Sequence, residues 1–154
     1  MLFRSGSDTA GEIDAIGEGV EGWRLGDRVM GRSRGAYAQF ALADPRLLSP
    51  VPASLSWEEA AAVPIVFGVT HDMLWTQGNL QPGEWLLVTA ISSGVGVACL
   101  QAAKAMGARV IGTSGSSAKL ERLRSLGLDV GLKTRAADFS DRVLEATGGK
   151  GADL

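Results

Sequence analysis

Small residues between Val88 and Gly96 have the composition of a nucleotide-binding turn. The segment reads Val-Thr-Ala-Ile-Ser-Ser-Gly-Val-Gly, and Ala90, Ser93 and Gly96 stand where dinucleotide-binding turns carry three glycines. Backbone N–H groups at the start of a helix, together with the helix dipole, attract a diphosphate. A strand–helix turn that binds no ligand is the alternative. We predict a diphosphate site at Ala90, Ser92, Ser93, Gly94, Val95 and Gly96.

A second group of polar residues follows the next apolar run. NAD-selective sites usually carry an acidic residue there, which binds the ribose hydroxyls. This chain instead has Thr-Ser-Gly-Ser-Ser from Thr113 to Ser117, and then Lys119. Hydroxyl groups and a cation suit a 2′-phosphate, so the pattern favours NADP(H). Ser116 or Ser117 as a helix cap and Lys119 as a solvated side chain are compatible alternatives. The predicted residues are Ser114, Gly115, Ser116 and Lys119.

A second glycine motif matches the dinucleotide pattern only formally. Gly17-Glu-Gly19-Val-Glu-Gly22 has the required spacing, but Trp23 to Asp27 after it has the composition of a turn entering a strand. A diphosphate site needs a helix start at that point. We therefore predict a glycine-rich hairpin there.

The elements that must position the predicted turn alternate regularly after Glu84. Short apolar runs alternate with amphipathic segments, which is typical of a parallel sheet with crossover helices and therefore of an α/β domain. We expect strands at 85–89, 109–113 and 130–132, and helices at 94–106, 117–126 and 139–147.

The first third of the chain has the composition of β structure. Short strands are expected at 11–16, 28–30 and 36–43, followed by a loop marked by Pro45, Pro50 and Pro52. Ser56 and Glu59 form a capping box that opens a helix ending near Pro64, and a second helix is expected over 66–77. The predicted division is a β domain over 1–55, connecting helices over 56–83 and a nucleotide-binding domain over 84–154.

Composition excludes several classes of function. The chain has 154 residues, a formal net charge of -2, and scattered Lys and Arg residues that form no basic stripe for nucleic acid. Cys99 is the single cysteine, so neither an internal disulfide nor a cysteine-based zinc site can form. Without a signal peptide or a long apolar run, we expect no membrane association and a cytoplasmic location.

These motifs, taken in order, resemble the medium-chain dehydrogenase/reductase superfamily, and within it the zinc-independent quinone oxidoreductase branch that includes the p53-inducible group. The resemblance implies a partial GroES-like domain and the first half of a Rossmann domain. It also implies hydride transfer from NADPH to a small-molecule quinone or activated alkene (enone). The segments that carry it are 6–12, 17–20, 26–29, 35–38, 58–64, 80–84, 94–96, 107–110, 137–139 and 148–151.

The resemblance also implies roles for three further residues. Thr134 stands where many NADPH-binding members have a tyrosine near the 2′-phosphate. Thr70 neighbours a position where the family has a threonine, so it is a candidate for a polar contact at the active site. An ordinary helix threonine is the alternative. His71 is a candidate to line the substrate cleft and to transfer a proton there, or else a residue that makes a structural hydrogen bond. No metal is expected, since Gly6-Ser7-Asp8 replaces the Gly-His-Glu of zinc-dependent relatives.

By comparison with the family, we interpret the chain as an internal fragment. The family's β domain begins before Gly6 and its sheet continues past Leu154, so the strand at 85–89 is expected to be an exposed edge. The parent protein is expected to be a homodimer. An enoyl-thioester reductase of the same superfamily and a nucleotide-binding but inactive fragment are the alternatives.

Overall fold

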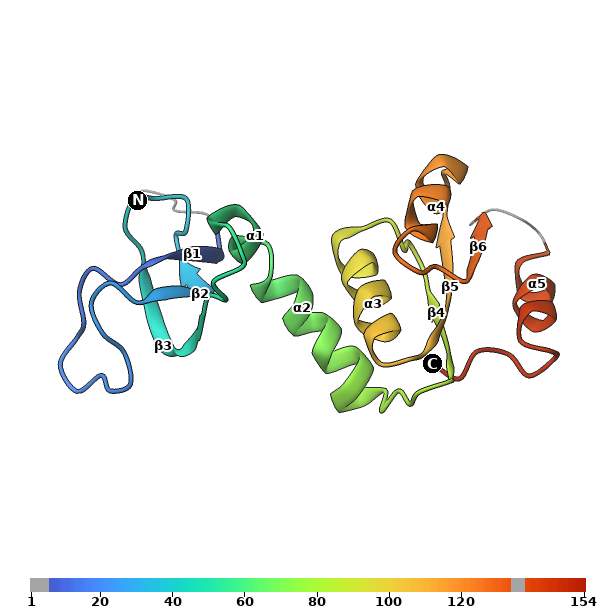
Figure 1. Cartoon of the computed structure of the whole chain (residues 1–154), viewed down its shortest axis with the longest axis horizontal. Coiled ribbons are helices and arrows are strands. Elements are labelled where there is room, and N and C mark those ends of the chain that lie inside the picture. Colours follow the sequence, from blue (N-terminus) through green and yellow to red (C-terminus); the bar gives the residue numbers. More distant parts are fainter. Residues whose placement is uncertain (1–5, 134–137) are drawn as a thin grey trace. The chain divides into compact units, whose positions relative to one another are not determined.

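The chain forms two compact units in a computed structural model, which describes residues 6–133 and 138–154. The units divide at Gly68/Val69, within the segment predicted to connect two domains. The first unit contains β1 (Asp8–Glu12), β2 (Arg28–Arg34), β3 (Leu42–Pro50), α1 (Trp57–Ala61) and the start of α2 (Pro64–His71). The second unit contains η1 (Asp72–Gln77), β4 (Trp85–Val88), α3 (Gly94–Ala105), β5 (Arg109–Ser114), α4 (Ser117–Arg124), β6 (Val130–Lys133) and α5 (Phe139–Ala146) (Figure 1).

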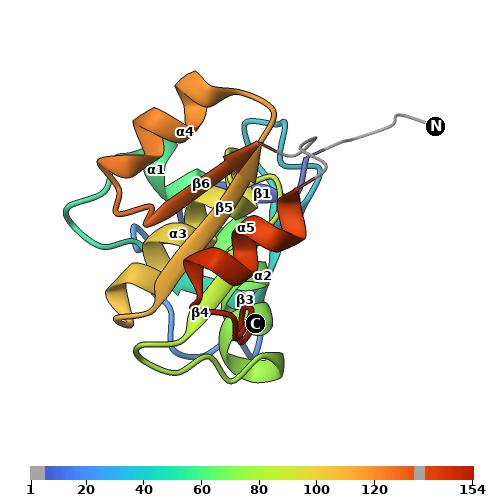
Figure 2. The ribbon, with the colours of Figure 1, turned by 90° about the vertical axis from the view of Figure 1, so that its right-hand side faces the viewer.

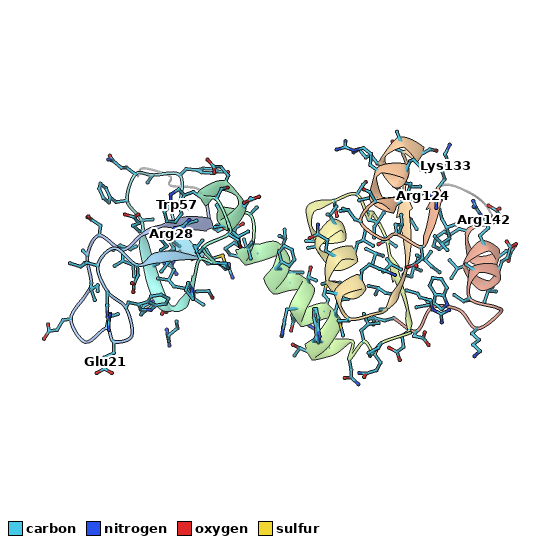
Figure 3. All side chains as sticks on the ribbon, viewed as in Figure 1. Glu21, Arg28, Trp57, Arg124, Lys133 and Arg142 are labelled. Carbon is cyan, nitrogen blue, oxygen red and sulfur yellow. The ribbon has the colours of Figure 1, made fainter. Side chains whose placement is uncertain are left out.

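The first unit is an antiparallel sheet in the order β1-β2-β3. Ile13 N–H donates to Asp27 O at 3.0 Å, so the glycine-rich segment between β1 and β2 is the predicted hairpin connection and no helix follows it. Arg28 extends from β2 with its guanidinium carbon 4.2 Å from the ring centre of Trp57, and it donates to Leu55 O at 3.0 Å (Figure 3). This cation–π contact attaches α1 to the sheet.

The third strand corrects the sequence prediction. A strand was expected at 36–43 and a proline-marked loop after it, whereas β3 runs from Leu42 to Pro50. Pairing with β2 shifts register between Gly31 and Ser33, so Pro45 lies in a bulge. Proline has no N–H to donate, and bulges and edge strands are the places where a sheet tolerates it. The prolines therefore mark an irregular edge strand.

The connecting helices follow the predicted signals. Ser56 Oγ accepts from Glu59 N–H at 3.2 Å, and Glu59 Oε2 accepts from Ser56 N–H at 2.9 Å, which confirms the capping box. Pro64 is the first residue of α2, where its missing N–H costs no hydrogen bond. The helix predicted over 66–77 is present, but its second half is the π-helix η1.

The second unit is a parallel sheet in the order β4-β5-β6, as the alternating pattern predicted. Helices α3 and α4 cover one face and α5 covers the other (Figure 2). Alternate residues of each strand point to opposite faces, so Leu86 and Val110 pack with α3 and α4, while Leu87 and Ile111 pack with α5. Both faces are therefore buried, as is usual for a parallel sheet.

Polar contacts fasten the ends and the edge of this sheet. Asp129 Oδ2 accepts from Val110 N–H at 2.7 Å and from Lys104 Nζ at 2.8 Å, which ties α3 and β5 to the turn before β6. At β4, Asp153 N–H donates to Trp85 O and Leu87 N–H donates to Leu154 O, both at 2.8 Å. The edge of β4 that was expected to be exposed is thus paired in part by the last residues of the chain.

Candidate functional site

The predicted nucleotide-binding turn connects β4 to α3 and is fastened to the neighbouring strand. Ile91 N–H donates to Thr113 O at 2.9 Å, and Ala90 N–H donates to Thr113 Oγ1 at 3.1 Å. Ala90 has a φ of 51°, in the left-handed region that favours glycine. The turn therefore has the backbone geometry expected where the standard motif places its first glycine.

Gly96 is required by close packing within the turn. A Cβ atom at this position would lie 2.6 Å from Ile91 O and 2.7 Å from Ala90 O, which are backbone atoms that cannot move independently of the turn. Gly112 of β5 faces Ile91 from the neighbouring strand, since a Cβ added at Gly112 would lie 2.8 Å from the Ile91 side chain. The two glycines thus allow helix, turn and strand to approach one another closely.

The first turn of α3 presents donors toward solvent. Ser93 is the N-cap and its Oγ accepts from Gly96 N–H at 3.1 Å. Within residues 6–133 and 138–154, the N–H groups of Gly94 and Val95 have no acceptor. Gly94 is exposed and Val95 is half-buried, so an anion can reach both groups. Free amides at the positive end of a helix suit a diphosphate.

The end of β5 lies against this turn. Ser92 Oγ and Ser114 Oγ are 3.1 Å apart, and Ser114 Oγ also accepts from Ser116 N–H at 3.3 Å. Ser116 caps α4, because its Oγ accepts from Lys119 N–H at 3.4 Å. Gly115 is exposed beside them. The structure thus brings Ser92, Ser114, Ser116 and Lys119 together, and it confirms the predicted capping role of Ser116.

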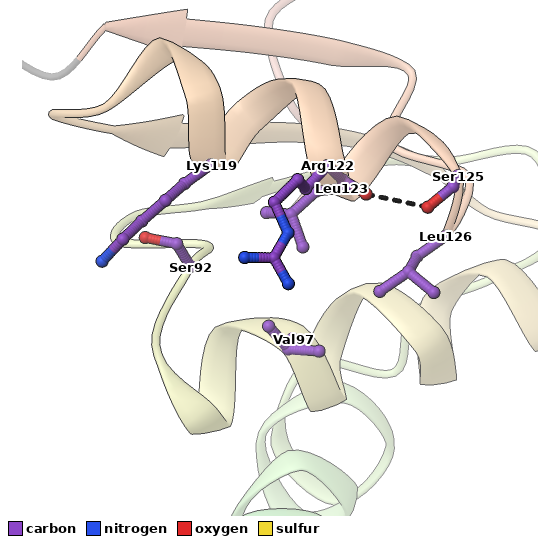
Figure 4. Close-up of a pocket in the computed structure, with 7 residues that line it drawn as sticks. All are labelled: Ser92, Val97, Lys119, Arg122, Leu123, Ser125 and Leu126. Carbon is purple, nitrogen blue, oxygen red and sulfur yellow. Dashed lines mark hydrogen bonds between the residues drawn. The ribbon is translucent and has the colours of Figure 1, made fainter.

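A cavity of about 520 Å³ opens beside this cluster, between α3 and α4 (Figure 4). Lys119 and Ser92, both predicted, are part of its lining. The sequence interpretation missed the rest of the wall, although the spacing 119, 122, 123 and 126 marks one face of a helix and could have indicated it. The missed lining residues are Val97, Arg122, Leu123, Ser125 and Leu126.

Of the three residues suggested by the family resemblance, Thr70 is buried and His71 is exposed. Thr70 is 1% exposed, and its Oγ1 lies 3.6 Å from Cys99 Sγ, a contact that fastens the helix end to α3. His71 is exposed and stacks on Trp75 with ring centres 5.3 Å apart. Thr134 lies outside the described residues. The structure therefore gives Thr70 and His71 packing contacts and joins neither to the nucleotide-binding turn.

Neither a metal-binding cluster nor a membrane-spanning helix is present among the described residues. Among residues 6–133 and 138–154, no group of three or more His, Cys, Asp or Glu side chains is arranged to hold a metal ion. No helix in the same ranges is both long enough and apolar enough to cross a membrane.

Comparison with known families identifies the two units. The family model of the alcohol dehydrogenase GroES-like domain matches residues 3–53, and that of the zinc-binding dehydrogenase matches residues 94–154. The chain is also 34% identical to the quinone oxidoreductase of Rattus norvegicus over its whole length, covering 47% of that protein. The chain belongs to the medium-chain dehydrogenase/reductase superfamily. The first unit is accordingly a GroES-like β domain, and the second has the Rossmann arrangement of its first three strands.

The chain is also similar to short stretches of polyketide synthases and to solved structures of related length. The chain is 40% identical to erythronolide synthase EryA2 of Saccharopolyspora erythraea over 97% of its length, although this covers 4% of that synthase. Mycobacterial Rv1454c, solved in complex with NADPH, is 34% identical with a TM-score of 0.90, and CurK enoyl reductase is 33% identical with a TM-score of 0.85. These matches cover 97% and 96% of the chain, and 48% and 44% of the two solved chains, so the chain spans about half the length of such relatives.

Proposed function

We propose that the protein is a zinc-independent oxidoreductase that transfers hydride from NADPH to the conjugated double bond of a small acceptor, such as a quinone or an enone. The observation that carries the proposal is that two candidate anion-binding sites lie next to each other, one at the turn before α3 and one at the end of β5. The turn offers the free amides of Gly94 and Val95 to a diphosphate. The end of β5, with Ser116 and Lys119 but no carboxylate, suits a 2′-phosphate.

The residues present fit this dinucleotide. Gly96 leaves open the space that a Cβ would fill against Ala90 O and Ile91 O, so α3 can begin directly at the turn, with the free amides of its first turn available to a diphosphate. The bound dinucleotide would supply the hydride. The chain's own residues would bind and orient it through the first turn of α3, with the Lys119 cation beside the ribose phosphate. Reduction of a conjugated acceptor by direct hydride transfer needs no metal to polarise a carbonyl, which is consistent with the single Cys and single His of this chain.

An enoyl thioester is the second candidate acceptor. Polyketide synthases and an enoyl reductase are among the relatives, and an α,β-unsaturated thioester accepts hydride at the same kind of carbon as an enone. The nucleotide subsites would be the same in both cases. The two candidate functions differ in the acceptor that is reduced. In both cases we propose that the parent protein is a homodimer.

Thermal melting and turnover test the proposal in sequence. The chain should melt cooperatively, and NADPH should raise its melting temperature more than NADH does. An equal rise with both dinucleotides, or none, would contradict NADPH selectivity. Oxidation of NADPH, followed by its absorbance in the presence of a 1,4-quinone, an enone or an enoyl thioester, then identifies the acceptor. NADPH binding without turnover of any acceptor by the full-length parent would favour a nucleotide-binding protein that is not an enzyme.

A further inference from the structure

Arg122 is the second cation of the cavity between α3 and α4. It lies three residues after Lys119, so both side chains extend from the same face of α4. In Figure 4, the Lys119 side chain passes beside Ser92, and the Arg122 guanidinium extends into the cavity above Val97. The two cations therefore line the same cavity, Lys119 beside Ser92 of the turn and Arg122 above Val97 of α3.

The charge of this pair is uncompensated within the described residues. No carboxylate lines the cavity, and neither Lys119 nor Arg122 forms an ion pair in residues 6–133 and 138–154. Arg124, on the same helix, differs in this respect because its Nε lies 3.0 Å from Glu121 Oε2. The lone acidic residue of α4 is thus paired outside the cavity.

The surroundings hold the Arg122 segment in place. Ser125 Oγ donates to Arg122 O at 2.8 Å, and the buried Leu123 anchors this turn of α4 in the core of the unit. Val97 and Leu126 form apolar walls, against which the aliphatic stem of an arginine can lie while its charged end stays free. A cavity with apolar walls and a few charged groups is a typical ligand site.

We propose that Arg122 determines the preference for NADPH over NADH by sharing the 2′-phosphate with Lys119. This inference rests on the proposed NADPH-binding function. A phosphate monoester carries about −1.5 to −2 charges at neutral pH, so one lysine leaves it incompletely neutralised. The planar guanidinium binds two phosphate oxygens at once, which a lysine cannot do. The cation pair thus recognises the one group that NADH lacks.

The test compares R122Q with its matched control R124Q. Both substitutions remove one positive charge from α4. Arg122 lines the cavity, whereas Arg124 does not and is paired with Glu121. Affinities for NADPH and NADH, and for 2′,5′-ADP and 5′-AMP as minimal probes, would be measured by calorimetry in the full chain. We expect R122Q to weaken NADPH and 2′,5′-ADP roughly tenfold, the loss typical of a charge-assisted hydrogen bond. NADH and 5′-AMP should be unaffected, and R124Q should match the wild type.

Further variants separate the outcomes. R122K should retain part of the preference, since it keeps the charge without the planar geometry, and unchanged melting temperatures would exclude unfolding. Equal losses for R122Q and R124Q, or a loss for R122Q that is equal for NADPH and NADH, would overturn the role of Arg122. If K119Q loses the preference for NADPH over NADH and R122Q keeps it, the role of Arg122 is overturned while the proposed function stands. A wild-type chain without preference for 2′,5′-ADP over 5′-AMP would overturn both.

Discussion

The two units are stabilised in different ways. In the second unit, buried clusters lie on both faces of the sheet, and Leu100, Val110 and Ile111 are fully buried. In the first unit, the strands pair along their backbones and Val29, Val51 and Ala60 are buried, while Tyr37 and Leu42 of the β2–β3 region are 85% and 91% exposed. The turn between β4 and α3 therefore lies on a packed core, whereas the described residues of the β domain expose apolar side chains.

This difference explains why the candidate site can be assembled within one unit. Ile91, at the centre of the turn, belongs to the same buried cluster as Leu86 and Leu100. The core thus fixes the turn, and the turn fixes the free amides of α3. The described residues of the first unit have no comparable cluster, and Ser33 Oγ is buried there without a hydrogen-bond partner in residues 6–133 and 138–154.

The largest effect should come from core truncation in the second unit. Leu100→Ala removes a side chain that is 0% exposed, so it should lower the free energy of unfolding by about 2–5 kcal/mol. Leu42→Ala in the first unit removes an exposed side chain, so it should change the free energy of unfolding by less than about 0.5 kcal/mol. Denaturant unfolding measures both. A loss in Leu42→Ala similar to that in Leu100→Ala would contradict the exposed position of Leu42.

Gly96→Ala should rank next, since its Cβ would collide with backbone oxygens of the turn. Overpacking of this kind costs about 1–3 kcal/mol, and movement of the turn should also abolish NADPH binding. Thermal melting with and without NADPH measures both effects. The stability control is Gly115→Ala, where the added Cβ meets no atom within 4 Å and the melting temperature should be kept. Wild-type melting and binding in Gly96→Ala would contradict the packing argument.

Helix caps should have smaller effects, each confined to its own unit. Ser93→Ala removes the cap of α3 and Ser56→Ala removes that of α1, and each loss should cost about 1 kcal/mol. Amide hydrogen exchange would locate the effects. Protection should fall in α3 for the first variant and in α1 for the second. A loss of α3 protection in Ser56→Ala would show that the units unfold together.

The smallest effect should come from the exposed pair in β3. Hydrogen bonds from Arg46 lower the pKa of Asp44 from its ordinary value of 3.8 to about 2. Because the folded pKa is lowered, the stabilisation is present above the unfolded value and is lost as the pH falls from about 4 to about 2. NMR titration should give a midpoint of about 2 that rises toward 3.8 in Arg46→Gln. An unchanged midpoint in that variant would contradict the pairing, and melting near neutral pH should hardly respond to Asp44→Asn.

The accuracy of the sequence predictions differs between the units for a physical reason. In the second unit, buried strands and the capping residues Ser93 and Ser116 leave strong local signals, so the predicted bounds are close to the observed ones. In the first unit, Pro45 indicated a loop, because sequence alone does not reveal a bulge that depends on pairing with β2. Arg122 was missed because a charged residue that lines a cavity has the same local pattern as a solvated one.

The contacts of Asp129 imply that ionic strength acts unequally along the second sheet. At the amino end of β5, the Asp129 carboxylate forms an ion pair with Lys104 and accepts a hydrogen bond from Val110 N–H. At the carboxyl end, the turn is fastened by neutral amide and hydroxyl groups of Ala90, Ile91 and Thr113. Salt screens charges but leaves uncharged hydrogen bonds largely unaffected. Rising salt should therefore weaken the Lys104–Asp129 pair at the end opposite the turn, while the hydrogen bonds that hold the turn respond little.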